Sequence, residues 1–300
     1  MLSRRRFLKL LPAGLVALVA AATAPLVQVM ARPRVSRYAL KPAGWPDDFR
    51  LKICMLSDIH SCDPFMSIAR IRTICDQVNA QSADIILLLG DYVTGMPEVS
   101  GHVPSRDWAA ELGRLRAPLG LHAVLGNHDY WQDAAFQADP TIGTCRAQQA
   151  LEAVGIPVYV NRSVRLVKDG RPFWLAGLAD QAAIRADRSI RRWDNIGIDD
   201  LDATLSQVDD DAPVILMAHE PDIFQRVGRH IAVTLSGHTH GGQVNLFGWR
   251  PRAASRGSRR YPVGHFHEDG RDLIVSQGLG CSEVPIRIGC RPEILVIELG

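Results

Sequence analysis

Seven residues of metal-ligand types recur along the chain, each after a short apolar run. They comprise two carboxylates, four imidazoles and one amide, namely Asp58, His60, Asp91, Asn127, His219, His238 and His240. Mixed oxygen and nitrogen ligands suit Mn²⁺, Fe, Zn²⁺ or Co²⁺ better than Ca²⁺, which prefers oxygen alone. We therefore expect two divalent metal ions, about 3.5–4 Å apart and bridged by one carboxylate, as in other two-metal hydrolases. Asp91 is the best candidate for that bridge.

The elements that must position these residues are short buried strands. Apolar runs that end at candidate ligands predict strands at 51–56, 85–89, 121–125, 214–217 and 231–235. Intervening helices are predicted at 68–80, 108–115 and 198–207, and further strands at 157–167, 173–178, 273–276 and 294–299. Because strand ends and the loops after them form the ligand crevice of open α/β sheets, the seven side chains are expected to converge. The predicted fold is one α/β domain of mixed sheets covered by helices.

Local spacing supports the same site. Asp58-Ile59-His60 and His238-Thr239-His240 place ligand types at alternating positions, and alternating side chains of an extended segment face one side. Glycines at 90, 126, 237, 241 and 242 permit tight turns and close backbone approach. Each motif alone is weak, since a lone buried histidine is usually a core residue. Five such motifs in succession, each after an apolar run, favour a metal site over chance.

The N-terminal residues 1–31 are predicted to be a targeting segment. Arg4, Arg5 and Arg6 precede Phe7-Leu8-Lys9 and an apolar run from Leu10 to Val27. A basic head before an apolar stretch is typical of export signals, and the paired arginines resemble the signal read by the twin-arginine export machinery. The run is also long enough, at roughly 20 residues, to be a membrane anchor. We expect an exported protein, in the periplasm or on the outer face of the cytoplasmic membrane, with cleavage and tethering both open.

The amino-acid composition indicates which class of protein the rest of the chain forms. The chain is 47% hydrophobic and 22% charged, which is the balance of a folded globular protein. Residues 32–48, rich in Pro, Arg and Gly, are expected to be a leader to a domain that spans 49–300. The formal charge of +2 falls to −2 without the four basic residues of the first thirty, so no stable nucleic-acid complex is expected.

The six cysteines form no Cys-x-x-Cys motif, which argues against a zinc–thiolate site. An oxidising compartment would permit a disulfide between Cys281 and Cys290. Small buried thiols are the expected alternative for most of the six.

The order Asp-x-His, Gly-Asp, Gly-Asn-His-Asp, His and Gly-His-Thr-His resembles the calcineurin-like metallophosphoesterase superfamily, from Leu51 to the C-terminus. The twin-arginine head, Gly-His-Thr-His-Gly-Gly-Gln at 237–243 and Cys-Arg-Pro-Glu at 290–293 resemble its exported bacterial phosphodiesterase subgroup, related to the YaeI and YkuE proteins. The resemblance implies a four-layer α-β-β-α sandwich with a dinuclear site at the strand ends. It assigns Asp58, His60 and His240 to the first metal, Asn127, His219 and His238 to the second, and Asp91 to both.

The resemblance also implies that His128 is the catalytic histidine beside the scissile phosphate of a phosphate-ester substrate. Metal-activated hydroxide would attack in line, and His128 would donate a proton to the leaving oxygen or stabilise the transition state. Asp129 is a candidate orienting partner, and a supporting role of His128 beside Asp58 or Asp91 is the alternative. Tyr92 follows Asp91 where protein Ser/Thr phosphatases have Asp-Arg-Gly. The missing arginine argues against a phosphoprotein substrate.

The substrate itself stays open. Arginines 250, 252, 256, 259 and 260 could attract anionic lipid headgroups or a nucleotide phosphate, or could form a solvated basic loop. A lipid-precursor pyrophosphatase acting on UDP-2,3-diacylglucosamine is the alternative enzyme, since that chemistry occurs on this scaffold. A non-catalytic scaffold that binds phosphorylated ligands is the alternative outside catalysis. His265 and His267 also alternate but receive no assignment.

Overall fold

The structure is a computed structural model that describes residues 27–96, 101–187, 189 and 194–300. Most of the predicted targeting segment, residues 1–26, lies outside the described residues. Within the described ranges, no helix combines the length and the apolar character needed to cross a membrane.

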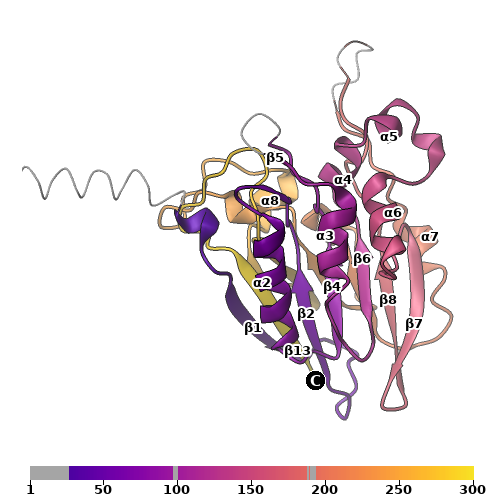
Figure 1. Cartoon of the computed structure of the whole chain (residues 1–300). Helices are drawn as coiled ribbons and strands as arrows, with labels where there is room; N and C mark the ends of the chain where they lie inside the picture. The colour runs from indigo at the N-terminus through magenta and orange to yellow at the C-terminus, as the bar shows by residue number, and fades with distance from the viewer. Residues whose placement is uncertain (1–26, 97–100, 188, 190–193) are drawn as a thin grey trace, which may run out of the picture.

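Two β-sheets form the centre of the molecule (Figure 1). The first has the strand order β1-β13-β2-β4-β6, and its strands are β1 (Arg34–Leu40), β2 (Leu51–Leu56), β4 (Ile85–Leu89), β6 (Leu121–Val124) and β13 (Glu293–Leu299). The second has the order β11-β12-β10-β9-β8-β7, and its strands are β7 (Arg162–Lys168), β8 (Arg171–Gly177), β9 (Val214–Met217), β10 (Ile231–Ser236), β11 (Gly264–Glu268) and β12 (Arg271–Val275). Two short strands, β3 (Cys62–Asp63) and β5 (Gly101–His102), pair separately.

Helices cover the outer faces of both sheets. Those beside the first sheet are α2 (Ile68–Asn79), α3 (Ser105–Leu112), α4 (Asn127–Trp131), α5 (Ala134–Ala138), η1 (Pro140–Ile142) and α6 (Arg146–Ala153). Beside the second sheet lie α7 (Leu201–Leu205), η3 (Pro221–Gln225) and α8 (Arg256–Arg260), whereas η4 (His240–Gly242) lies in the loop after β10. Figure 1 shows α2, α3 and α6 side by side in front of the first sheet. The predicted four-layer α-β-β-α sandwich with mixed sheets is confirmed.

Strand β2 shows how one apolar run serves two cores. Ile53 and Met55 pack between the sheets, whereas Cys54 and Leu56 pack under the helices. Alternate side chains of a strand point to opposite faces, so a strand buried on both sides reads as a continuous apolar run. Strands β2, β4 and β6 are parallel, as are β8, β9, β10 and β12. Their carboxyl ends therefore deliver the loops of each sheet to one edge.

Some element boundaries differ from those predicted. Helix α3 begins at Ser105 rather than Trp108, after Pro104, and ends before Gly113. The predicted strand 157–167 is represented by β7, which begins only at Arg162. Residues 34–40, inside the expected leader, form the edge strand β1, which pairs with β13 along its whole length. The basic and polar composition of this segment obscured an edge strand whose side chains are exposed or half-buried.

The cysteines behave as the buried-thiol alternative predicted. All six are buried, and Cys281 and Cys290 are separate thiols rather than a disulfide pair. The Cys290 thiol donates a hydrogen bond of 3.2 Å to the carbonyl of Gly241, in the turn that follows His240.

Candidate metal centre

All seven candidate ligands lie in loops or helix starts at the carboxyl ends of five strands. Asp58 and His60 follow β2, Asp91 follows β4, Asn127 begins α4 after β6, His219 follows β9, and His238 and His240 follow β10. The donor atoms form two groups in which all lie within 4.8 Å of one another: Asp58, His60, Asp91 and His240, then Asp91, His219 and His238. Asn127 joins the second group, since its Oδ1 lies 3.0 Å from His238 Nδ1. The two groups share Asp91.

Distances between donor atoms fit the edges of metal coordination shells. His60 Nε2 lies 3.1 Å from His240 Nε2, and His240 Nε2 lies 3.3 Å from Asp58 Oδ1. Asp91 Oδ2 lies 3.4 Å from His60 Nε2 and 3.2 Å from His219 Nε2. Metal–ligand bonds of about 2.0–2.2 Å put neighbouring ligand atoms roughly 3 Å apart. Asp91 Oδ2 thus faces one histidine of each group, as a bridging carboxylate must.

Two of the histidines are oriented by their other ring nitrogen. His60 Nδ1 lies 2.9 Å from the carbonyl of Val93, and His219 Nδ1 lies 2.6 Å from the carbonyl of Leu89. A carbonyl partner fixes the proton on Nδ1 and leaves the lone pair of Nε2 for a cation. His219 Nε2 is buried and lies 3.2 Å from Asp91 Oδ2. Buried nitrogens directed in this way toward a carboxylate are what a metal site requires.

The loops reach this geometry through an unusual backbone conformation. Positive φ angles, between 47° and 67°, occur at five candidate ligands: Asp58, His60, Asp91, His238 and His240. Such angles are uncommon in residues with a side chain and mark functional sites when the surroundings enforce them. The sequence argument that paired ligands alternate along an extended segment was therefore wrong. The pairs converge through tight left-handed turns instead.

Glycines make these turns possible. A Cβ at Gly126 would lie 2.4 Å from Asp91 Oδ1, and one at Gly237 would lie 1.8 Å from the hydroxyl of Ser57. A Cβ at Gly126 would push against Asp91, and one at Gly237 would push against Ser57 and Asp58. Relieving either clash would therefore move a candidate ligand. The glycines predicted for close approach at 126 and 237 thus keep the strand ends together.

Burial and charge set the ionisation of the carboxylates. Burial raises the pKa of Asp58 to about 6, against the opposing charge of His219. Burial also acts against the charged forms of Asp91 and His219, but their mutual attraction outweighs it. The pKa of Asp91 is lowered well below its usual range, and that of His219 is raised well above its usual range. Without a cation, a buried proton on His219 therefore balances Asp91.

The remaining candidate histidine ligands are held neutral. Burial lowers the pKa of His60, His238 and His240 and outweighs the opposing effect of the nearby carboxylates of Asp91 and Glu220. Neutral imidazole is the form that binds a metal ion.

His128 lies beside the two groups rather than inside them. Its backbone N–H donates to Asp91 Oδ1 at 2.8 Å, and its Nε2 lies 3.2 Å from the Ser282 hydroxyl. Its ring packs edge-on to His60 and against Trp131, and its buried Nδ1 has no hydrogen-bond partner. Burial lowers the pKa of His128 to about 3, so the ring is neutral near pH 7. A neutral ring can still donate one N–H to a ligand.

Asp129 does not orient His128, contrary to the sequence prediction. Its carboxylate accepts four backbone N–H groups, with donor–acceptor distances of 2.8–3.1 Å, from Gly126, Asp91, Tyr92 and Val93. It therefore ties the loop after β4 to the start of α4. The contact positions Asp91, and only indirectly His128.

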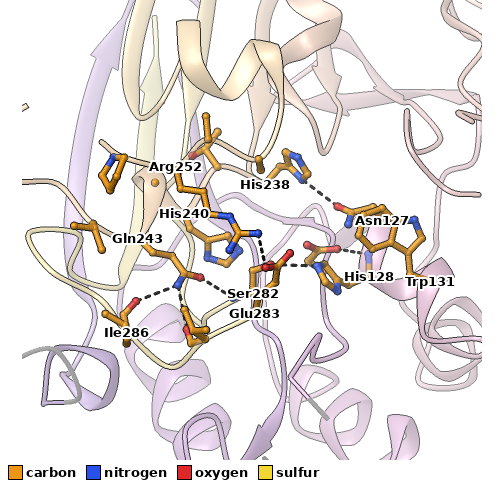
Figure 2. Close-up of a pocket in the computed structure, with 18 residues that line it drawn as sticks. Asn127, His128, Trp131, His238, His240, Gln243, Arg252, Ser282, Glu283 and Ile286 are labelled. Carbon is orange, nitrogen blue, oxygen red and sulfur yellow. Dashed lines mark hydrogen bonds and ion pairs between the residues drawn. The ribbon is translucent and has the colours of Figure 1, made fainter. Parts of the chain in front are cut away.

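A cavity of about 350 Å³ opens above the candidate ligands (Figure 2). Asp91, Asn127, His128, His238 and His240 form its polar floor. Its walls include Trp131 and Ser282, the ion pair between Arg252 and Glu283, and an apolar side formed by Val244, Pro251, Val284 and Ile286. In Figure 2, His238 points toward Asn127, and His128 and Trp131 lie beside Asn127.

Three polar groups near the site were not predicted from the sequence. Ser282 contacts His128, and Arg287, which is fully buried, donates to the carbonyls of Gln277 and Gly280 and approaches His240 Nδ1 at 3.2 Å. Asp180 and Glu220 are buried together, and burial followed by the charge of Glu220 raises the pKa of Asp180 well above its usual range. Ser282, Arg287 and Asp180 lie far in sequence from the motifs and give no local signal of these contacts.

Most of the arginines at 250–260, and the pair His265 and His267, lie outside the cavity. Arg252 alone of the predicted basic segment lines the cavity, and Arg260 pairs with Glu268 away from it. His265 and His267 both bond Oδ1 of Asp272 on the neighbouring strand, at 2.7 and 2.9 Å. That pair is thus a cross-strand contact on the second sheet.

Comparisons with known proteins agree with this geometry. Residues 51–242 match the family model of the calcineurin-like phosphoesterases. A metallophosphoesterase of Bacillus subtilis, YkuE, is 29% identical over 266 residues, covering 87% of this chain and 82% of that protein. A metallophosphoesterase of Aquifex aeolicus is 27% identical over 271 residues, covering 89% and 91%. A transmembrane protein with metallophosphoesterase domain from Danio rerio is 27% identical over 287 residues, covering 91% of this chain and 59% of that protein.

The family match spans well over half of the chain and contains every candidate ligand. The chain therefore belongs to the calcineurin-like phosphoesterase family and has the candidate divalent-metal site of a metal-dependent phosphoric ester hydrolase.

Proposed function

We propose that the protein is an exported phosphodiesterase with a two-metal centre. The observation that carries the proposal is the pair of donor groups that share Asp91 below an open cavity. Asp58, His60 and His240 would hold the first ion, and Asn127, His219 and His238 the second. When bound, two such ions neutralise charge on the phosphate oxygens and supply hydroxide at neutral pH.

The chain's own residues would then position the ester. Ser282 lies 3.2 Å from His128 Nε2, and the buried Nδ1, which has no hydrogen-bond partner, packs close to Gly95. His128 would donate a hydrogen bond to the substrate and, once the substrate's charge favours it, a proton to the leaving oxygen. Trp131 packs against the ring and limits its rotation.

A diester suits the cavity better than a monoester. Among the described residues that line it, Arg252 is the one cationic side chain outside the candidate ligands, and Glu283 already pairs with it. A monoester dianion presents one more charge to be neutralised than a diester. The apolar side formed by Val244, Val284 and Ile286 offers a place for the second ester arm.

The test compares bis-p-nitrophenyl phosphate with p-nitrophenyl phosphate, using purified chain supplied with Mn²⁺. We expect a higher kcat/KM for the diester. Preference for the monoester would contradict the diesterase proposal while leaving a phosphoesterase. Binding of both esters without turnover would instead support the non-catalytic scaffold.

A lipid-precursor pyrophosphatase is the second candidate, because the same apolar side could accept an acyl chain. Hydrolysis of UDP-2,3-diacylglucosamine, with little hydrolysis of UDP-glucosamine, would favour it. Export rests on the paired arginines and the apolar run, which precede the described residues.

A further inference from the structure

Exposed apolar side chains surround one side of the cavity mouth. Phe247 is 108% exposed and Trp249 is 62% exposed, and Leu246, Val284 and Ile286 add further exposed apolar surface. We call these five residues the apolar rim. Val284 and Ile286 also line the cavity, so the rim and the candidate active site are continuous. Contiguous exposed apolar surface on a folded domain marks an interaction site.

The tip of the rim is a rigid turn. Leu246 and Trp249 exchange two backbone hydrogen bonds of 3.0 Å, and the side chain of Asn245 accepts from Gly248 at 2.8 Å. Phe247 and Gly248 have φ angles of 54° and 96°. Positive φ at both central positions is the type I′ pattern, which favours Asn-Gly. A bulky aromatic residue is poorly suited to this position, and full exposure leaves Phe247 without packing to offset that cost.

The rim is fastened to the beginning of the described chain. The N–H of Asn245 donates to the carbonyl of Ile288 at 2.8 Å, and the N–H of Gly289 donates to Gln28 Oε1 at 3.0 Å. Figure 1 shows the indigo start of the described chain beside a yellow loop from the C-terminal part of the sequence. The apolar N-terminal run, residues 10–27, therefore ends at the same corner of the molecule as the rim.

That corner is also basic. Segments 27–34 and 243–256 carry five basic residues and no acidic residue, and Arg34 pairs with the buried carboxylate of Glu293. Arg250 donates to the carbonyl of Gly241, and Arg291 donates to the carbonyl of Arg32. These guanidinium groups meet neutral oxygens and keep their charge. Glu283 pairs with Arg252 and offsets one positive charge of the corner.

We propose that the apolar rim inserts into the headgroup boundary of an anionic lipid bilayer, on the side where the N-terminal run meets the same membrane. Tryptophan and phenylalanine favour this boundary, where apolar faces lie about 5–10 Å deep. Basic residues near the surface are attracted to anionic lipids. The apolar rim, the basic residues and the end of the N-terminal run lie at one corner, so a single bilayer surface can contact all three.

Docking in this way turns the cavity mouth toward the lipid. Resting on the proposed phosphodiesterase function, this orientation selects phosphodiesters presented at the membrane surface. Soluble diesters would still reach the floor of the cavity.

The test places a polarity-sensitive fluorophore on the rim of the full chain. The six native cysteines are buried, so Phe247→Cys offers the one reactive thiol on the described surface. Val167→Cys is the matched control, since Val167 is 49% exposed on β7, at the opposite side of the molecule in Figure 1. Each labelled chain is reconstituted into phosphatidylglycerol–phosphatidylethanolamine vesicles, with and without brominated lipids.

We expect the label at 247 to shift its emission to shorter wavelength and to be quenched by brominated lipid, while the label at 167 keeps its aqueous spectrum. Equal spectra at both positions would overturn the proposal and leave the N-terminal run as a simple tether. A shift at 247 only at high protein-to-lipid ratio would also overturn it, because that result indicates contact with a second copy. This readout needs no catalysis, so failure of the phosphodiesterase proposal would not obscure it.

A turn-preserving variant separates docking from the fold. Phe247→Asn suits the type I′ turn and removes the aromatic ring. It should keep hydrolysis of soluble bis-p-nitrophenyl phosphate and lose most hydrolysis of a diester embedded in vesicles, while Val167→Asn keeps both. Equal retention of both activities by Phe247→Asn would contradict the role of the rim.

Discussion

Asp91 and His128 are joined by a 2.8 Å hydrogen bond from the backbone N–H of His128 to Asp91 Oδ1. The other oxygen, Oδ2, faces His60 and His219 at 3.4 and 3.2 Å. One oxygen thus fixes the carboxylate to the start of α4, and the other is directed between the two donor groups. Metal binding and the position of the candidate catalytic histidine are therefore coupled through a single carboxylate.

Replacing Asp91 tests that coupling. Asp91→Ala should lose half or more of the bound metal and reduce turnover by more than about 100-fold, because even supporting residues of metal sites cost about 10–100-fold. Metal content and kcat on a diester are the measurements. Asp91→Asn keeps an oxygen that can accept from the His128 N–H but loses the negative charge. Its metal content and turnover should lie between those of the unaltered protein and those of Asp91→Ala. Full metal occupancy and normal turnover in Asp91→Ala would rule out a bridge.

His128→Ala separates proton transfer from metal binding. Metal content should stay near normal, and turnover should fall by about 10²–10⁴-fold on alkyl esters, whose leaving groups need a proton. The loss should shrink on p-nitrophenyl esters. An equal loss on both esters would assign His128 to stabilising charge on the phosphate, which its depressed pKa also permits. Loss of one metal ion from His128→Ala would instead show that His128 is a metal ligand.

Asp129→Asn tests the role found for this carboxylate. The amide would turn an NH₂ group toward two of the four backbone donors, and each unsatisfied buried donor costs about 1–3 kcal/mol. We expect a lower melting temperature and weaker metal binding, with activity partly restored by excess metal. Asp169→Asn, in an exposed hairpin turn, is the control that should change neither property. Unchanged stability in Asp129→Asn would remove the carboxylate's positioning role.

Metal binding should release protons near neutral pH. In the metal-free site the pKa of His219 is raised well above its usual range by Asp91, so a cation must displace that proton. Metal affinity should therefore rise with pH. Calorimetric titrations in buffers of different ionisation enthalpy measure the released proton directly. Identical heats in all buffers would show that His219 is already neutral.

Export can be tested without changing charge. Replacing Arg4, Arg5 and Arg6 together with lysine should block export, because the twin-arginine pathway recognises arginine rather than positive charge. The location of the folded protein in fractionated cells is the readout. Normal export of the triple variant would indicate the general secretory route or a plain anchor.

The sequence predicted most of the sheet and the convergence of the candidate ligands. Apolar runs such as 85–89 are buried on both faces, and the polar residue that ends each run is placed at the sheet edge by topology alone. Local turn geometry was not predictable in the same way. The positive φ angles of Asp58 and His60 are imposed by packing against the loops after β4 and β12, which lie far along the chain.

Long-range polar contacts were also beyond the sequence. Ser282 reaches His128 across 154 positions, and Arg287 reaches His240 from a loop without a motif. Strand β1 was missed because an edge strand with exposed basic residues lacks the apolar run that identified its neighbours.

Metal stoichiometry against activity tests the central claim most directly. Metal-free protein is titrated with Mn²⁺, and bound metal and hydrolysis of bis-p-nitrophenyl phosphate are measured at each step. The shared position of Asp91 between two donor groups predicts that activity saturates when two ions are bound per chain. Saturation at one ion per chain, or two bound ions without hydrolysis above the metal-only control, would contradict a two-metal phosphodiesterase.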